Sequence, residues 1–234
     1  MMKHRLLIPI LCVMTLTGAA QRIVKPKVKT STSFAIVIDQ KSYDKVGDAV
    51  DAYKASIEDD GLATYLLIDD WKSPEAIREQ LKRLYSEKKS PLEGCVFVGD
   101  IPIPMIRDAQ YLTSAFKMNQ SRDWKESSVA SDRFYDDFDL TFDFLKQDED
   151  LPLYFYYSLR ADSRHQLAPE IYSGRIKPLE REGADKYEQL EKYLRKVVRE
   201  KKDNKENTLD HLSMGRGHHY NSQDRGAWAG EQLA

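Results

Sequence analysis

Three groups of side chains in this sequence could do chemistry, and each indicates a different kind of site. In the first group, carboxylates follow three successive apolar runs: Asp39, then Asp69 with Asp70, then Asp100. Ligands of open α/β sheets bind at the carboxyl ends of the strands, so these acids could hold Mg²⁺ for phosphoryl chemistry. Neither an Asp-x-Asp-x-Thr motif nor a Gly-x-x-x-x-Gly-Lys-Ser/Thr loop accompanies them. The pattern therefore favours aspartates that begin turns and cap the following helices.

The second group is a segment, residues 131–144, in which acids are mixed with aromatic residues. Its acids are Asp132, Asp136, Asp137, Asp139 and Asp143. Carboxylate oxygens at this density could coordinate Ca²⁺, and we assign Asp136, Asp137 and Asp139 to such a structural site. The spacing is not that of an EF-hand loop. A solvated acidic loop whose aromatic side chains are anchored in the core is the alternative.

The third group is a single thiol. Cys95 lies in the middle of an apolar run, with no neighbouring base in the sequence. A buried cysteine behaves as a small hydrophobic residue, and burial raises the pKa of its thiol. We therefore predict that Cys95 is a core residue and not a nucleophile.

Short apolar runs alternate with amphipathic segments over the first hundred residues. The expected strands span residues 34–39, 62–68 and 94–98. One helix opens at Ser42 and stops at Gly61, and a second has Ser73 as its N-cap and Pro74 at its first position. This β-α-β-α-β order, with helices long enough for right-handed crossovers, predicts a parallel sheet.

The second half of the chain is less regular. Pro102 and Pro104 predict a loop after the third strand, and residues 108–149 form an aromatic stretch too long for a plain connection. Further on, we expect strands at 153–159 and 170–176, a charged amphipathic helix at 185–202 and the beginning of a strand at 209–214. The predicted fold class is therefore α/β. It is a parallel, doubly wound sheet of the Rossmann-like or caspase-like kind with flanking helices, and its second α/β subdomain is incomplete.

Three short sequence motifs follow one another along the chain: Gly94–Met105 (GCVFVGDIPIPM), Ser131–Asp139 (SDRFYDDFD) and Pro169–Ile176 (PEIYSGRI). Together they resemble the amino-terminal half of the gingipain-like cysteine peptidases, which are secreted enzymes with a caspase-like fold. In that family a VGD-I-P strand, an SD-x-x-Y segment and a PE-x-x-x-GR strand precede the catalytic histidine and cysteine. The resemblance covers roughly Phe34 to Trp228.

The resemblance implies roles for a few residues. Asp132 would be a substrate-facing or structural acid near the substrate groove. In the family the strand that corresponds to the one holding Arg175 is structural, and we expect Arg175 itself to order the edge of a loop through a salt bridge with an acid of the acidic segment. The family's nucleophile follows a later strand than the one that holds Cys95, so we assign no catalytic residue. We expect both the nucleophile and its base to lie beyond Ala234.

Histidines near the end of the chain are the remaining candidates for a catalytic base. His218 lies in Gly215–Ser222 (GRGHHYNS), whereas the family's catalytic histidine has a Gly-His-Gly context and comes later along the chain. Adjacent residues of a strand point to opposite faces, so His218 and His219 would not form a joint metal site unless the loop bends. We interpret both as loop residues, with His218 as a disfavoured candidate for the base, and leave His165 and His211 unassigned.

The amino terminus has the features of a secretory signal peptide. A basic start is followed by apolar residues 6–20, and Gly18–Ala20 supplies the small residues that a signal peptidase requires, so we expect cleavage before Gln21. A run of about 15 apolar residues is short for a membrane span, which needs about 20, and an uncleaved anchor is the alternative. We therefore expect export to the bacterial periplasm, outer membrane or exterior, with no membrane span after cleavage.

Charge and cysteine content narrow the class of protein. The formal charge is −2, and it becomes −4 when Lys3 and Arg5 leave with the signal peptide. This near balance of interspersed charges gives no case for nucleic-acid binding. After cleavage only Cys95 remains, so no internal disulfide can form and the core must be stable without one.

These observations predict four segments and one principal function. The segments are a signal peptide (1–20), a flexible lead-in (21–33), an amino-terminal α/β subdomain (34–160) and the start of a catalytic-type subdomain (161–234). The function is that of an exported gingipain-like cysteine peptidase acting on a protein or peptide, in a portion that lacks the catalytic cysteine and is inactive alone. No cofactor is required beyond the structural Ca²⁺ considered above. A non-catalytic binding or scaffold module of the cell envelope is the second hypothesis, and a metal-dependent phosphohydrolase built on Asp39, Asp70 and Asp100 is the third.

Overall fold

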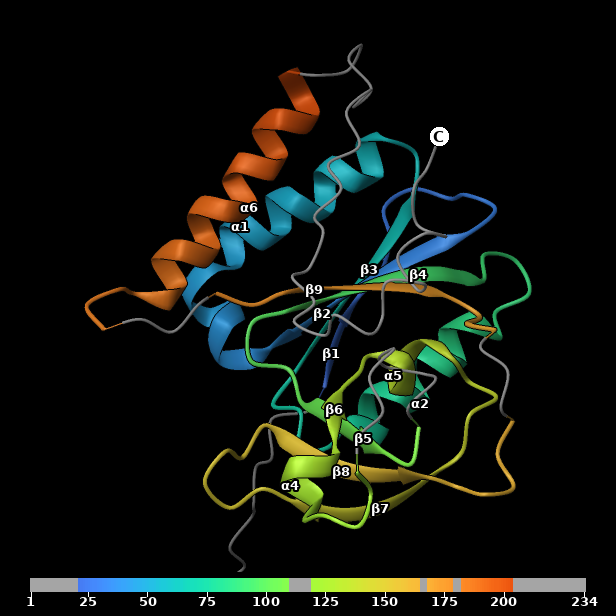
Figure 1. The fold of residues 1–234 in the computed structure, drawn as a ribbon. Coiled ribbons are helices and arrows are strands. Elements are labelled where there is room, and N and C mark those ends of the chain that lie inside the picture. The colour runs from blue at the N-terminus through green and yellow to red at the C-terminus, as the bar shows by residue number, and fades with distance from the viewer. Residues whose placement is uncertain (1–20, 110–118, 165–167, 179–181, 204–234) are drawn as a thin grey trace, which may run out of the picture.

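The computed structural model describes residues 21–109, 119–164, 168–178 and 182–203 (Figure 1). Their fold belongs to the mixed α/β class and contains two sheets. The strands of the first sheet are β1 (Arg22–Val24), β2 (Ser33–Asp39), β3 (Ala63–Asp69), β4 (Leu92–Val98) and β9 (Tyr172–Ile176). Those of the second sheet are β5 (Ile103–Arg107), β6 (Val129–Ala130), β7 (Phe142–Gln147) and β8 (Tyr154–Leu159). The described helices are α1 (Gln40–Asp59), α2 (Pro74–Tyr85), α4 (Trp124–Ser127), α5 (Arg133–Asp136) and α6 (Lys186–Asp203).

Four neighbouring strands of the first sheet run parallel, in the order β3-β2-β4-β9, and β1 pairs antiparallel with β3. Every residue of β2 is buried, as expected of a central parallel strand whose two faces are both covered. The register places Asp39 beside Asp69, and Ile38 beside Val98. The carboxyl ends of these strands therefore meet at one edge of the sheet.

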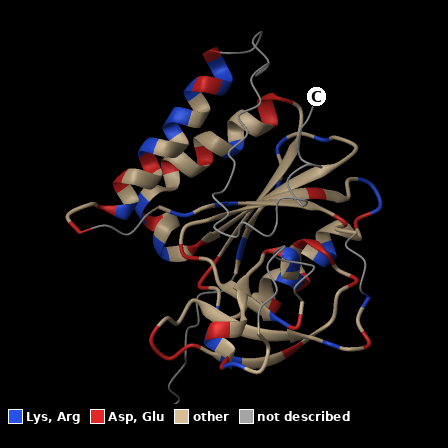
Figure 2. Cartoon of the chain, viewed as in Figure 1, with Lys and Arg blue, Asp and Glu red and all other residues tan. Residues whose placement is uncertain are grey.

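Helices cover both faces of the first sheet. α1 and α6 pack against each other on one face, where Val50, Leu190 and Leu194 belong to the same core as the strands. Ile77 and Leu81 of α2 belong to the core on the other face, which also includes side chains of α5 and the second sheet. Figure 1 shows the α1–α6 pair above the first sheet and α2, α5 and the second sheet below it. Charged residues lie mainly on the helices and loops, and the central strands are nearly free of them (Figure 2).

The two long helices of the first half begin at caps that their sequences specify. Asp39 Oδ1 accepts a hydrogen bond from the backbone N–H of Ser42 at 2.8 Å, so α1 starts just before the residue expected to open it. Ser73 is the N-cap of α2, with Pro74 at the first helical position as predicted. These caps fix the direction in which each helix leaves its strand.

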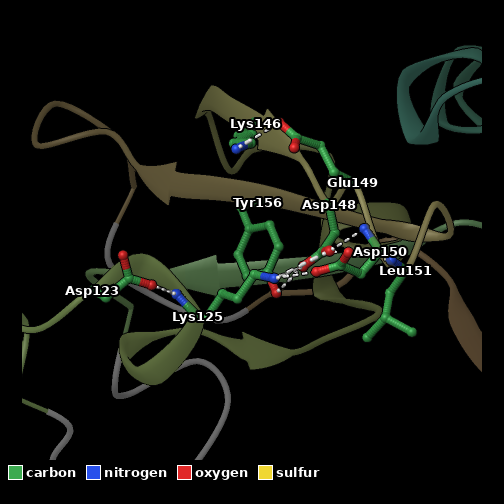
Figure 3. A network of polar contacts seen from close by, with 8 residues as sticks. All are labelled: Asp123, Lys125, Lys146, Asp148, Glu149, Asp150, Leu151 and Tyr156. Atoms are coloured by element: carbon green, nitrogen blue, oxygen red, sulfur yellow. Dashed lines mark hydrogen bonds and ion pairs between the residues drawn. The ribbon is translucent and has the colours of Figure 1, made fainter.

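The second sheet has the order β6-β5-β8-β7, with β5 and β8 parallel and each outer strand antiparallel to its neighbour. One buried carboxylate organises the β7–β8 hairpin. Asp148 accepts hydrogen bonds from the N–H groups of Asp150 at 2.9 Å and Leu151 at 3.1 Å, and from the hydroxyl of Tyr156 at 3.2 Å. Lys125 of α4 lies 3.1 Å from the same carboxylate (Figure 3). The hairpin is thereby tied to α4.

The structure contains strands that the sequence does not predict, among them β6 and β7 within the stretch 108–149. Residues 22–24, expected within a flexible lead-in, form β1, and Pro104, expected in a loop, lies inside β5. The carbonyl of Pro104 accepts a hydrogen bond from Ser131 N–H at 3.0 Å, so the side of Pro104 that lacks an N–H faces the β6 region. Pro104 therefore lies opposite Ser131, directly after the end of the two-residue strand β6, where the ladder stops.

Elements on the two sides of the predicted boundary at residue 160 pack together. β9 and α6, which follow that boundary, lie on the first sheet, where β9 pairs with β4 and α6 contacts α1. β5 to β8, which precede it, form the second sheet. The strand predicted at residues 209–214 lies outside the described residues.

Candidate functional site

The guanidinium of Arg175, which belongs to the third sequence motif, contacts residues of the other two. Its Nη1 donates to the carbonyl oxygen of Ile101 at 3.0 Å, and its Nη2 donates to that of Pro102 at 3.2 Å. Nε and Nη2 also donate to the carboxylate of Asp132, at 3.2 and 2.7 Å, which makes a two-pronged ion pair. The guanidinium lies 5.1 Å from the ring centroid of Phe97. We call Arg175, Asp132 and the carbonyl groups of residues 101–102 the Arg175 cluster.

The pairing of the strands brings these groups together. β9 pairs in parallel with β4, with Arg175 beside Phe97, so the arginine leaves the sheet near its carboxyl edge. Asp132 lies at the N-cap position of α5, but its carboxylate makes no capping hydrogen bond and turns to Arg175 instead. The Arg175 side chain is 17% exposed and that of Asp132 is 26% exposed. The predicted ion pair between Arg175 and the acidic segment is confirmed, whereas a substrate-facing role of Asp132 stays a prediction.

Asp136 and Asp137 are completely buried beneath the first sheet. Asp136 Oδ2 accepts a hydrogen bond from Ser173 Oγ at 2.6 Å, and its Oδ1 lies 3.2 Å from Arg133 Nη1. Burial raises the pKa of Asp136 to about 6, and the Ser173 hydrogen bond and the Arg133 charge offset this only in part. Asp137 accepts a hydrogen bond from the N–H of Ala168 at 3.1 Å. These two side chains fasten the acidic segment to its surroundings.

The three acids assigned to Ca²⁺ have separate protein partners. Asp139 is exposed and forms an ion pair with Arg164, while Asp136 and Asp137 make the buried contacts just described. Within the part of the chain that the structure describes, no group of three or more His, Cys, Asp or Glu side chains is arranged to hold a metal ion. The structure does not bring the three carboxylates together, and Ca²⁺ binding by this segment stays a prediction.

The acids at the carboxyl ends of β2 and β4 also have structural partners. Asp39 Oδ1 caps α1, and its Oδ2 accepts a hydrogen bond from the N–H of Asp100 at 2.8 Å. Gly99 between them has φ +81°, and a Cβ there would lie 2.4 Å from Asp39 Oδ2. Conformation and space therefore both require glycine at this position. The interpretation of Asp39 as a cap is confirmed.

Asp100 forms ion pairs with two lysines. Lys177 lies 3.2 Å and Lys186 lies 2.5 Å from its carboxylate. Burial by itself would raise the pKa of Asp100, but the hydrogen bonds and charges of the two lysines outweigh burial and lower it. At the end of β3, Asp69 accepts a hydrogen bond from the N–H of Asp70 at 2.8 Å, and Asp70 pairs with Lys72. The strand-end acids thus have separate partners and do not form the cluster that phosphoryl chemistry would need.

Cys95 lies inside β4 and is 1% exposed. Burial raises the pKa of its thiol well above the ordinary value, and the carboxylates of Asp136 and Asp132 raise it further. The prediction that Cys95 is a core residue is confirmed. The five histidines of the sequence, among them His218 and His219, lie outside the described residues.

Sequence reasoning missed the contacts that hold the acidic segment against α2. Arg78 Nη2 donates to the carbonyl oxygens of Asp137 at 2.9 Å and Leu140 at 2.7 Å. The hydroxyl of Tyr157 in β8 donates to Glu75 of α2 at 2.7 Å. Apolar periodicity identifies the buried stripe of α2, but it cannot show which of its charged residues reach across to a neighbouring loop. Within the described residues, the site is therefore built from groups that hold structure in place.

No protein-family model, no curated protein and no solved structure matches this chain. A separate finding concerns membranes: none of the helices in the described ranges is long and apolar enough to cross one.

Proposed function

We propose that this chain is the amino-terminal, structural portion of an exported cysteine peptidase of the gingipain-like kind. The observation that carries the proposal is the Arg175 cluster. Each of the three sequence motifs on which the resemblance is based contributes to this cluster: Ile101 and Pro102 from the first, Asp132 from the second and Arg175 from the third. Three unrelated short matches would have no reason to converge on one guanidinium.

The strand order of the first sheet supports the same proposal. The parallel strands β3-β2-β4-β9 have helices on both faces, which fits the doubly wound arrangement of a caspase-like fold. Peptides and other ligands of such sheets bind outside the carboxyl ends of the strands. The Arg175 cluster lies close to that edge, and Asp132 is its more exposed side chain. In this proposal the cluster fixes the floor of a groove for a protein or peptide substrate.

The thiol of the proposed peptidase is not Cys95. In thiol peptidase chemistry a histidine takes the thiol proton, the thiolate attacks the carbonyl carbon of the scissile bond, and the leaving amine receives the proton. A buried thiol with a raised pKa can neither reach a peptide nor ionise readily. We therefore place nucleophile and base in residues beyond Ala234, and we expect residues 21–234 alone to be inactive.

Export is the second part of the proposal, and it is based on residues 1–20 of the sequence. The apolar run and the small residues before Gln21 favour secretion to the periplasm, the outer membrane or the exterior of a bacterium. Ca²⁺ is available in those places, so binding by the acidic segment is retained as a part of the proposal that needs its own titration.

The intact mass of the native protein from its source cells, with iodoacetamide labelling of the same sample, tests the proposal. The 234 residues have a mass of 27.1 kDa. We expect a native mass well above this value and one rapidly alkylated cysteine other than Cys95. A native mass equal to that of the chain without its signal peptide, with Cys95 unreactive until unfolding, would overturn the peptidase proposal.

A non-catalytic binding or scaffold module of the cell envelope is the second candidate. It is favoured by the fact that the acids and the thiol highlighted by the sequence are buried or bound to protein partners. Hydrolysis of a fluorescent casein by the native protein, before and after alkylation, separates the two candidates. Hydrolysis that alkylation abolishes supports the peptidase, and a native protein that binds casein without cleaving it supports the module.

A further inference from the structure

β9 is an outer strand of the first sheet, and among the strands that the structure describes it pairs with β4 alone. The carbonyl of Ile176 accepts a hydrogen bond from Gly99 N–H at 3.0 Å, so the backbone groups of Ile176 face β4. The direction of these groups alternates along a strand. The N–H and C=O groups of Ser173 and Arg175 therefore face outward, away from the sheet.

This edge lacks the features that protect the other outer strands. β7 has a register shift between Phe144 and Lys146, β6 is two residues long and β1 is three residues long. β9, in contrast, keeps a regular register with β4 over five residues and contains neither proline nor lysine. Natural sheets use short strands, bulges, proline and lysine to prevent edge-to-edge pairing. β9 is thus an edge that can accept another strand.

A strand that directly follows α6 would fit this edge poorly. α6 lies on the same face of the sheet as α1, and the β2-α1-β3 connection crosses that face in the direction of β3. A right-handed connection from β9 across the same face would lead toward β4, where the neighbouring position is occupied. An outward connection would be left-handed, whereas about 98% of such connections are right-handed. A strand that directly follows α6 is therefore a poor partner for the outer edge of β9.

β9 is complementary to itself. In an antiparallel pair related by a two-fold axis at Gly174, Ser173 of one copy lies opposite Arg175 of the other. These are the two residues whose backbone groups face outward, so each such pair exchanges both of its hydrogen bonds. Gly174 would face Gly174 of the second copy with the Cα atoms about 4.5 Å apart. In the single chain, a Cβ added at Gly174 would have no atom within 4 Å, so the described residues leave this space open.

Side chains on the α1 face of the sheet fit the same arrangement. The two-fold axis places Tyr172 of one copy opposite Ile176 of the other, and an aromatic ring opposite a β-branched side chain stabilises an antiparallel pair. Tyr172 is 54% exposed in the single chain. Its position is nevertheless fixed, because its ring lies 5.9 Å from that of Phe34 and its hydroxyl donates to Glu93 at 3.0 Å. A residue that is both exposed and fixed can bind without losing much freedom.

Charge favours antiparallel over parallel pairing. Glu93 and Glu170 lie near the amino end of β9, and Lys177 directly follows its carboxyl end. The two-fold axis brings the acidic end of each strand beside the basic end of the other, whereas parallel pairing would place like charges together. On the α2 face, Ser173 and Arg175 are already held by buried or partly buried acids, so pairing requires no rearrangement there.

We propose that β9 pairs antiparallel with β9 of a second copy of this chain, which joins two first sheets into one continuous sheet around an axis at Gly174. This inference goes beyond the proposed function and does not depend on it. The partner is a second copy, and an unrelated extended peptide or another segment of the same chain is an outcome that would contradict it.

A charge exchange at the axis tests the proposal directly. Sedimentation equilibrium of residues 21–234, which include every described residue, should give a concentration-dependent dimer. Gly174→Lys and Gly174→Glu should each weaken that dimer about fivefold, because like charges face each other across the axis. An equimolar mixture of the two variants should restore dimerisation, since lysine then faces glutamate. Gly174→Gln is the neutral control of matched size, and we expect it to stay within about threefold of the wild-type dissociation constant.

Cross-linking tests the same contact with a different readout. A Gly174→Cys variant should form an intermolecular disulfide on mild oxidation, because the facing Cα atoms fall within the range of about 4.4–6.8 Å that a disulfide spans. Leu151→Cys is the control, since Leu151 is 52% exposed and lies in the β7–β8 hairpin of the second sheet. Cys95 is buried and should not react in either variant. Thermal unfolding by circular dichroism verifies that each variant is folded.

Three outcomes would overturn the proposal. The first is a wild-type chain that sediments as a monomer at the highest soluble concentration. The second is a mixture of the charged variants that associates no better than each variant alone. The third is a monomer in which the amides of Ser173 and Arg175 are protected from hydrogen exchange, because this would assign the edge to a segment of the same chain.

Discussion

The carboxylates at the carboxyl edge of the first sheet and those beneath the sheet are surrounded differently. At the edge, Asp39 accepts hydrogen bonds from two backbone N–H groups, and Asp100 forms ion pairs with two lysines. Beneath the sheet, Asp136 has one hydroxyl donor and one guanidinium 3.2 Å away, and it is fully buried. The pKa of Asp100 is lowered, whereas that of Asp136 is raised to about 6.

The two aspartates differ in burial and in the donors around each carboxylate. Burial opposes ionisation in both regions, and the sign of the net shift depends on how many cationic donors compensate for it. Two ammonium groups are sufficient at Asp100, and one hydroxyl with one partly exposed arginine is insufficient at Asp136. A dense run of acids in a sequence can therefore reflect buried anchoring as readily as metal binding.

The largest change in the free energy of unfolding is expected when Arg175, which forms the ion pair with Asp132 of the acidic segment, is replaced. Arg175→Ala would leave Asp132 and the carbonyl groups of Ile101 and Pro102 without their donor in a partly buried site. Breaking a buried ion pair by removing one partner costs about 3–5 kcal/mol of unfolding free energy, and the remaining exposure places this case at the lower end. Urea unfolding monitored by circular dichroism measures the change.

Arg175→Lys is the matched control for that prediction. Lysine keeps the charge but cannot make a two-pronged contact with Asp132 and reach two carbonyl oxygens, so we expect it to recover less than half of the loss. If Arg175→Ala changed the unfolding free energy by less than about 1 kcal/mol, the Arg175 cluster would be no more than a surface ion pair.

The second prediction concerns pH and Asp136. Its pKa in the folded protein, about 6, lies above the ordinary value of 3.8, so the protonated side chain is the one that the fold favours. The contribution to stability is complete below about pH 3.8 and is lost as the pH rises through about 6. Asp136→Asn, which removes the buried charge, should raise the unfolding free energy at about pH 8 by roughly 2–3 kcal/mol.

The pH profile of the difference between wild type and Asp136→Asn is the decisive measurement. The advantage of the variant should shrink steadily between about pH 7 and about pH 4, because the wild-type carboxyl becomes protonated over that range. A difference that stays constant with pH would mean that asparagine changes packing or the Ser173 hydrogen bond, and that the pKa of Asp136 is not raised.

The sequence predicts the edge region better than the region beneath the sheet. β2, β3 and β4 are apolar runs that end at or just before an acid, and Ser73 with Pro74 is a strong helix start, so these elements follow from local chemistry. The cap formed by Asp39 follows in the same way. The sequence predicts an ion pair between Arg175 and an acid of the acidic segment, but it does not show that the partner is Asp132.

Of the second sheet, the sequence predicts only β8, because the other three strands carry little local signal. β7 (FDFLKQ) alternates between apolar and polar residues only over its first three positions, and Pro104 in β5 is unusual for a strand. β1 is three residues long and depends on pairing with β3. The role of Arg78, which binds the carbonyl groups of the acidic segment, depends on how α2 meets a loop about 60 residues away in sequence. Tertiary contacts of this kind have no periodic pattern in the sequence.

A smaller effect is expected at Asp39. Asp39→Ala removes the cap of α1 and the acceptor for the Asp100 N–H, and it leaves a space beside Gly99. Loss of an N-cap costs about 0.5–2 kcal/mol, and the additional unpaired N–H brings our expectation to about 2 kcal/mol. Asp39→Asn, which keeps one oxygen acceptor, should lose about half as much. Equal losses in the two variants would show that the charge, and not the cap, is the important feature.

The smallest change in the free energy of unfolding is expected for Asp100→Asn, and its sign is opposite to that of Asp136→Asn. The lowered pKa means that ionised Asp100 stabilises the fold above the ordinary value of 3.8, and that this contribution is lost as the pH falls through the lowered pKa. Because the site is partly open to water, Asp100→Asn should destabilise the protein by no more than about 1 kcal/mol at neutral pH. The loss should be smaller in about 0.5 M salt than in about 0.05 M salt, since salt screens the attraction of Lys177 and Lys186. Two identical changes, Asp to Asn, would then stabilise one region and destabilise the other, and equal signs at neutral pH would show that the count of cationic donors does not separate the two regions.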